Sequence, residues 1–138
     1  FINNKNKLQL YGSEMTRFLL DINEAIDLIL KSTKYSNVSV IPTAKSFKIK
    51  DLFEIYKEKF GLKYEITTPR TGEKIHEIMA SNEETRRMEY VKEDDLYLLH
   101  PKKEYNKVNF ENGEFSSRDH CLSREELYNY LELRNFYK

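Results

Sequence analysis

Apolar residues recur at helical spacing in two stretches of the first half of the chain. The first stretch predicts a helix over about residues 23–34, in which isoleucine and leucine side chains share one face. Asp21 and Asn23 are candidate N-caps for this helix, because both can accept hydrogen bonds from free backbone amides. Residues 46–50 lead into a second predicted helix, which ends at Gly61 because glycine readily adopts the left-handed conformation that closes a helix.

Short runs of apolar and β-branched residues predict extended segments between these helices. Gly12 ends the first run, and Pro42 stops another because proline lacks the amide that a strand ladder needs. In the second half of the chain, an acidic turn separates two further runs. The segments predicted to be extended are residues 8–11, 15–20, 38–41, 62–68, 88–91 and 96–100.

Three further helical segments are predicted in the second half of the chain. Ser81 with Glu84 forms a capping-box pattern that begins a short polar helix, and Ser123 with Glu126 begins the last helix in the same way. Between a turn at residues 69–72 and Ser81, apolar residues at positions 75, 78 and 79 predict another short helix. The polar stretch at residues 101–113 is predicted to be a loop.

The alternation of short strands with helices predicts one domain of mixed α and β class over residues 1–138. A chain of 138 residues is long enough to bury a hydrophobic core. Its strands are too few and too short for a complete doubly wound domain. Because the sequence begins with Phe1 rather than methionine, we expect a processed, truncated or excised piece of a longer protein.

Charge and composition exclude several classes of function. The 23 basic residues are matched by 23 acidic ones, which argues against binding to nucleic acid through bulk charge. No apolar run approaches the roughly 18 residues that span a bilayer, so no membrane association is expected. Cys121 is the single cysteine, which precludes an internal disulfide and fits a reducing compartment, so we expect a cytoplasmic protein.

Standard searches for catalytic chemistry give no strong candidate. His76, His100 and His120 lack partners at metal-ligand spacing, and Cys121 has no base near it in sequence. The chain also lacks the glycine-rich motifs that bind nucleotide phosphates. We therefore expect no metal site, no nucleophilic cysteine and no cofactor phosphate turn within these 138 residues.

Two arginines stand in more suggestive positions. Arg17 lies in an apolar, strand-like run, where a guanidinium either reaches solvent or is held near an anion. Arg70 follows a predicted strand and precedes Gly72, which permits close approach of a ligand to the backbone. The alternative interpretation of this second segment is a surface turn in which Glu73 caps the next helix.

Four motifs follow one another along the chain: EMTRF at residues 14–18, EAIDLIL at 24–30, IKDL at 49–52 and RTGEKIHE at 70–77. A serine pair at residues 116–117 is followed by LSREEL at residues 122–127. In this order and spacing, these motifs resemble the C-terminal part of extended short-chain dehydrogenase/reductases, and most closely the UDP-N-acetylglucosamine 4,6-dehydratases of polysaccharide biosynthesis. Some of those enzymes also epimerise C5.

The resemblance implies a fold and a set of contacts. The chain would be the small substrate-binding lobe of an extended short-chain dehydrogenase/reductase, a mixed α and β unit with short strands and about four helices. NAD(P) and the catalytic residues would belong to an N-terminal Rossmann lobe that this chain lacks, so the chain itself would bind no cofactor and catalyse no turnover. By matched position, Arg17 and Arg70 would contact the diphosphate of a UDP-sugar, and Glu73 would contact its ribose.

The same resemblance leaves alternatives open. Thr71 stands where the family usually has proline, so the turn before Gly72 is less rigid. A UDP-sugar epimerase of the same superfamily, or a non-catalytic module that binds a nucleotide or a partner, would also fit. The chain's partners would be a UDP-sugar and the Rossmann lobe, either in the same protein or on a partner chain, and the complete enzyme would be a homo-oligomer. Lys74 and His76 are expected to be structural.

Overall fold

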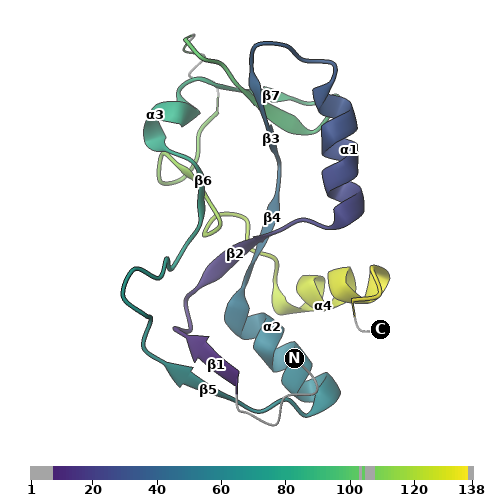
Figure 1. Ribbon diagram of the computed structural model, residues 1–138, viewed down its shortest axis with the longest axis vertical. Helices are drawn as coiled ribbons and strands as arrows, with labels where there is room; N and C mark the ends of the chain where they lie inside the picture. Colours follow the sequence, from purple (N-terminus) through teal and green to yellow (C-terminus); the bar gives the residue numbers. More distant parts are fainter. Residues whose placement is uncertain (1–7, 103, 105–107, 137–138) are drawn as a thin grey trace.

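The computed structural model describes residues 8–102, 104 and 108–136. Within them the chain is of mixed α and β class, as the sequence predicts, and it has four helices and several small sheets (Figure 1). The helices are α1 Ile22–Ser32, α2 Ile49–Phe60, α3 Asn82–Thr85 and α4 Arg124–Leu133. The strands are β1 Leu8–Tyr11, β2 Thr16–Leu19, β3 Ser39–Pro42, β4 Lys45–Lys48, β5 Tyr64–Thr67, β6 Ile78–Ala80, β7 Met88–Val91, β8 Leu96–Leu99 and β9 Phe115–Ser116.

The strands form four small sheets rather than one continuous sheet. β1 pairs with β5 in parallel, and β2 pairs with β4 in the antiparallel direction. β8 lies between β3 and β7, and β6 pairs with β9. Because β1 and β5 are parallel and in register from Leu8 with Tyr64 to Tyr11 with Thr67, the loops that follow them leave the sheet at the same edge.

Local capping explains where the helices begin and end. The N-cap side chains of α1, α3 and α4 accept backbone hydrogen bonds, and a glutamate three residues later closes each capping box. α2 ends at Gly61, whose φ of 65° is the left-handed conformation expected at this position. The predicted caps Asp21, Ser81 and Ser123 are confirmed, and the predicted stop at Gly61 is confirmed as well.

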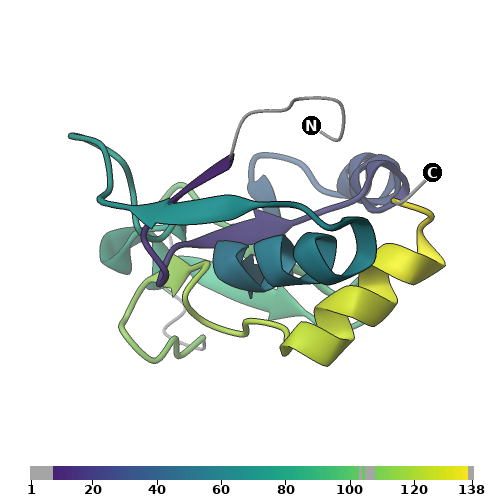
Figure 2. The same cartoon turned by 90° about the horizontal axis from the view of Figure 1, so that it is seen from below.

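Two hydrophobic clusters hold these elements together. The first lies where α2 and α4 pack side by side (Figure 2) next to β4, and its buried members are Phe47, Ile55, Leu127, Tyr130 and Leu131. The second has Ile41, Ala80, Met88 and Phe115 at its centre, and half of the partly buried residues around it are aromatic. The second cluster joins β9 to the sheet formed by β3, β8 and β7.

The structure corrects the sequence predictions in three places. The helix predicted from the apolar residues at positions 75, 78 and 79 is wrong, because residues 73–77 form a loop and β6 Ile78–Ala80 follows it. β4 and β9 were not predicted. β4 lies in the segment expected to lead into a helix, and each strand exists through pairing with a distant partner, β2 or β6.

Two remaining predictions concern regions that are only partly described. Of the loop predicted at residues 101–113, residues 103 and 105–107 lie outside the described residues, and the rest of the segment is irregular. The prediction of one domain over residues 1–138 likewise includes residues 1–7 and 137–138, which are outside. In the described part of the chain, no helix has the length and apolar character needed to cross a membrane.

Candidate functional site

The candidate site is built from the loops that follow β1 and β5. Gly12 ends β1 with a φ of 93°, a conformation that side chains rarely allow. Its amide donates to the carbonyl of Thr67 over 3.1 Å, which ties the two loops together. A Cβ atom at Gly12 would lie only 3.3 Å from Cγ of Pro69, so glycine is also favoured by the close packing here. The sheet edge therefore brings the segment after Gly12 next to the segment that contains Arg70.

Arg17, on β2, is held by the loop at residues 73–77. Its Nη2 lies 3.0 Å from Oε1 of Glu73, and its Nε lies 3.3 Å from Oε1 of Glu77. Its Nη1 also donates to the carbonyl oxygen of Ile75 over 3.3 Å. The Arg17 side chain retains 23% of its exposure, so the guanidinium is half-buried and still reachable. The structure thus brings together Arg17 and Glu73, two of the three residues singled out from the sequence.

Arg70, the third of these residues, has a different partner. Its guanidinium carbon lies 4.4 Å from the centre of the Tyr11 ring, and its Nη2 donates to the Tyr11 hydroxyl. The turn that it begins is closed by the amide of Glu73, which donates to the carbonyl of Arg70 over 3.0 Å, and Gly72 occupies the turn with a φ of 83°. Arg70 and Glu73 are therefore neighbours through their backbones, while their side chains have separate partners.

A buried polar network fixes the loop behind Arg17. Thr16 is 3% exposed, and its hydroxyl lies 2.7 Å from Oγ of Ser117 and 2.8 Å from Nδ1 of His76. The amide of Glu77 donates to the hydroxyl of Ser117 over 2.8 Å. These contacts join β2, the loop at residues 73–77 and the segment after β9, because each buried polar group needs a partner there.

Sequence reasoning missed several residues of this arrangement. Glu77 is the last residue of the RTGEKIHE segment, and Ser117 belongs to the serine pair noted above, so each carried a weak signal. Thr16 lies within the EMTRF segment and carried a similarly weak signal. Tyr11 carried none, since its contact with Arg70 depends on chain folding. The histidine at position 76 is tied to a buried threonine, which is the kind of contact expected for a structural residue.

The charges of the site define what it can do. The guanidinium of Arg17 faces two carboxylates, those of Glu73 and Glu77, so an entering anion would have to displace a carboxylate from Arg17. Guanidinium groups bind phosphate oxygens well through paired N–H donors. Among the residues that the structure describes, no group of three or more acidic, histidine or cysteine side chains is arranged to hold a metal ion.

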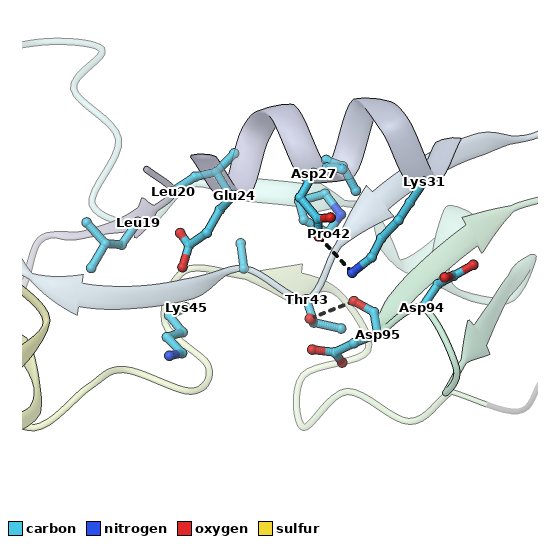
Figure 3. A pocket seen from close by; sticks show the side chains of 12 residues that line it. Leu19, Leu20, Glu24, Asp27, Lys31, Pro42, Thr43, Lys45, Asp94 and Asp95 are labelled. Carbon is cyan, nitrogen blue, oxygen red and sulfur yellow. Dashed lines mark hydrogen bonds and ion pairs between the residues drawn. The ribbon is translucent and has the colours of Figure 1, made fainter. Parts of the chain in front are cut away.

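A separate cavity of about 230 Å³ lies between α1, the link from β3 to β4 and the turn between β7 and β8 (Figure 3). Asp27 and Lys31 form an ion pair of 2.8 Å at its rim, and the Thr43 hydroxyl donates to the carbonyl of Asp95 over 3.0 Å. The cavity is smaller than the roughly 300–1,000 Å³ typical of sites for small molecules. None of the three candidate residues lines it.

Comparison with a family model decides the family. The model described as "polysaccharide biosynthesis protein" matches residues 1–98, a span that contains Arg17, Arg70 and Glu73. The chain belongs to this polysaccharide biosynthesis protein family. The family resemblance seen in the sequence motifs is thereby confirmed at the level of the family, while the dehydratase group within it stays a prediction.

Two proteins show how this family member compares with longer chains. An uncharacterised membrane protein, MJ1061 of Methanocaldococcus jannaschii, is 33% identical over 99 residues, which cover 64% of this chain and 29% of that protein. The X-ray structure of Pen from Bacillus thuringiensis matches with a TM-score of 0.78 at 21% identity, over 96% of this chain and 42% of Pen. The likeness to Pen concerns the fold alone. This chain spans less than half the length of either protein.

Proposed function

We propose that this chain is the UDP-sugar-binding part of an NAD(P)-dependent UDP-N-acetylglucosamine 4,6-dehydratase. The observation that carries the proposal is the meeting of Arg17 and Glu73, which come from separate elements. Both belong to motifs that resemble the dehydratases, and both lie within the match to the polysaccharide biosynthesis family. A half-buried guanidinium beside an acidic loop is suited to bind a nucleotide diphosphate together with its ribose.

In the proposed complex, the diphosphate replaces Glu73 as the partner of Arg17. Glu77 keeps its contact with Nε of Arg17, so the guanidinium stays oriented while its Nη2 turns to the ligand. The released carboxylate of Glu73 then accepts hydrogen bonds from the two ribose hydroxyls. Arg70, which the Tyr11 ring holds at the edge of the β1–β5 sheet, supplies the second positive charge. The site thus exchanges an internal ion pair for contacts with the nucleotide.

The cofactor would be bound outside this chain. A dinucleotide phosphate turn needs clustered glycines between a strand and a helix. Here the four glycines stand singly at positions 12, 61, 72 and 113, and the junction of β4 with α2 has none. The residues present do not fit NAD(P), so we assign no step of hydride transfer to them.

The remaining parts of the proposal follow from placing the substrate on this chain and the cofactor outside it. Residues 1–138 form the substrate-binding lobe of an extended short-chain dehydrogenase/reductase. A Rossmann lobe, in the same protein or on a partner chain, would hold NAD(P), which would supply the redox chemistry of the 4,6-dehydration. The complete enzyme works in the cytoplasm as a homo-oligomer, and the 138-residue chain alone turns over no substrate.

Calorimetric titration with UDP tests the binding role. Arg17→Ala and Arg70→Ala should each weaken UDP binding by about 10- to 150-fold, the range for losing a hydrogen bond to a charged group. Arg124→Ala is the matched control, because Arg124 pairs with Glu58 on the surface between α4 and α2. Absence of UDP binding by the wild-type chain, or equal affinity in all three variants, would contradict the proposal and favour a module that binds a protein partner.

A further inference from the structure

Helix α1 turns an apolar stripe toward solvent. Ile22, Ile26, Ile29 and Leu30 are 72%, 49%, 64% and 64% exposed, and none of the 11 residues of the helix is buried. At about 100° of rotation per residue, these four side chains fall within one stripe about 100° wide. An amphipathic helix of a globular protein normally turns such a stripe toward a hydrophobic core. In the part of the chain that the structure describes, the stripe of residues 22, 26, 29 and 30 stays largely exposed to solvent.

Polar contacts at both ends hold α1 in this orientation. At its beginning, the Arg134 guanidinium pairs with the carboxylates of Asp21 and Glu24. Just beyond its end, Nζ of Lys34 and the hydroxyl of Tyr35 each lie 2.6 Å from an oxygen of Asp94. An isolated helix of this length is marginal in water. These end contacts therefore make the stripe a preformed surface, on a helix that lies at one side of the molecule (Figure 1).

The comparisons indicate what covers the stripe. The fold match with Pen covers 96% of this chain but only 42% of Pen. The sequence match with MJ1061 covers 29% of that protein. The longer proteins therefore have more than half of their length available to pack against this unit. We propose that the α1 stripe is the docking surface for an apolar face of the part of the family-length polypeptide that this chain lacks. This inference rests on the proposed function only in identifying that part as the cofactor-binding lobe.

A second copy of this chain is the poorer occupant. A stable association between separate chains buries roughly 800 Å² on each partner, which four side chains do not supply. A segment of the same polypeptide needs less area, because tethering gives it a high effective concentration at the stripe. The small stripe is therefore matched to an intramolecular partner.

Hydrogen exchange, followed by mass spectrometry, tests the proposal on two polypeptides. One is the 138-residue chain, and the other is the same chain extended through the reading frame upstream of Phe1. The amides of α1 should exchange at least about 10-fold more slowly in the extended polypeptide, since burial stabilises the helix. Equal exchange in the two polypeptides, or a reading frame that does not extend upstream of Phe1, would overturn the proposal.

A double variant gives an independent readout. Ile26→Glu with Ile29→Glu should leave the thermal midpoint of the 138-residue chain within about 2 °C of wild type, and lower that of the extended polypeptide by about 10 °C or more. Ile66→Glu is the matched control, because Ile66 is 57% exposed on a different element, β5, and its effect should be small in both. Equal effects of the double variant in both polypeptides would overturn the proposal. The proposal would also be overturned if the wild-type 138-residue chain sedimented as a dimer while its double variant sedimented as a monomer.

UDP titration of the extended polypeptide separates this inference from the proposed function. Protection of α1 without UDP binding would overturn the proposed function and leave the docking surface standing. UDP binding without protection of α1 would do the reverse.

Discussion

Ser117 and Glu77 exchange two hydrogen bonds across forty positions of sequence. The amide of Ser117 donates to the carbonyl of Glu77 over 2.8 Å, and the amide of Glu77 donates to the Ser117 hydroxyl over 2.8 Å. Because the carboxylate of Glu77 contacts Nε of Arg17, a serine near the end of the chain fixes a partner of the candidate anion-binding arginine. The arrangement of the site therefore depends on the segment after β9.

The first prediction concerns Ser117→Ala. The substitution leaves the Glu77 amide without its acceptor and removes a partner of the Thr16 hydroxyl, and Ser117 is fully buried. The free energy of unfolding in urea should fall by about 1–3 kcal/mol, the cost of buried polar groups left without partners. Ser32→Ala removes an exposed hydrogen bond from the Ser32 hydroxyl to the carbonyl of Ile29 in α1, and it should change this free energy by less than about 0.5 kcal/mol. Equal stability of the two variants would show that the Ser117 hydroxyl has no such role.

The second prediction separates two roles of Glu73. In the free chain its carboxylate pairs with Arg17, and in the proposed complex it contacts the ribose. Glu73→Ala should therefore bind inorganic pyrophosphate more tightly, by about 3- to 10-fold, because the anion no longer competes with a carboxylate. The same variant should bind UDP more weakly relative to pyrophosphate than the wild-type chain does, because the ribose contact is lost.

Glu83→Ala, a change in the first turn of α3, is the control for charge removal. It should leave the affinities for both ligands within about twofold of wild type, since its carboxylate is not part of the ion pairs around Arg17. If Glu73→Ala weakened pyrophosphate binding as well, Glu73 would support the site structurally instead of competing for Arg17.

Local sequence signals predicted the elements whose causes are local. The N-caps Asp21, Ser81 and Ser123 each have a glutamate three residues later, and each begins a helix. Gly61 ends a helix because it adopts a positive φ. β4 and β9 have no comparable signal, since each forms through pairing with a strand distant in sequence. The helix predicted from the apolar spacing at positions 75–79 is wrong for the same reason. The strand β6 begins within this segment by pairing with β9, which is distant in sequence.

The candidate site likewise contains residues that the sequence indicates and contacts that depend on tertiary structure. Arg17 and Glu73 could be selected from motif positions, and the structure brings them within 3.0 Å of each other. The pairing of Arg70 with Tyr11 could not be predicted, because it follows from the parallel register of β1 with β5. The support from Ser117 likewise requires the chain to return to β2 after β9. Residue type and motif position therefore indicated candidate groups, whereas their partners depended on tertiary structure.

The third prediction is a loss of stability in acid that involves Asp21. The amide of Glu24 is the main cause that lowers the pKa of the Asp21 carboxyl, and Arg134 and the amide of Asn23 lower it further. A carboxyl whose pKa is lower in the folded state stabilises the fold above its unfolded value of about 3.9, and this contribution is lost as the pH falls through the folded-state pKa. Asp21→Asn keeps a capping oxygen but removes the charge.

Urea unfolding at a series of pH values checks this prediction. The wild-type chain should be more stable than Asp21→Asn at pH 7, and the difference should shrink progressively below about pH 4. Asp27→Asn is the control. Asp27 lies on the exposed side of the same helix, and its carboxylate forms an ion pair with Lys31. A difference between wild type and Asp21→Asn that stays constant from pH 7 to pH 2 would contradict the assignment.

The fourth prediction concerns the aromatic cluster behind β2. Phe115 is 2% exposed, and its ring centre lies 5.3 Å from that of Phe18 and 5.0 Å from that of Phe110. Phe115→Ala should lower the free energy of unfolding by about 3–5 kcal/mol, enough to unfold a marginal domain. Phe115→Leu should cost less and remain folded, and its UDP affinity should stay within about twofold of wild type, because Phe18 and Arg17 point to opposite faces of β2. A folded Phe115→Leu variant with much weaker UDP binding would show that the cluster also positions Arg17.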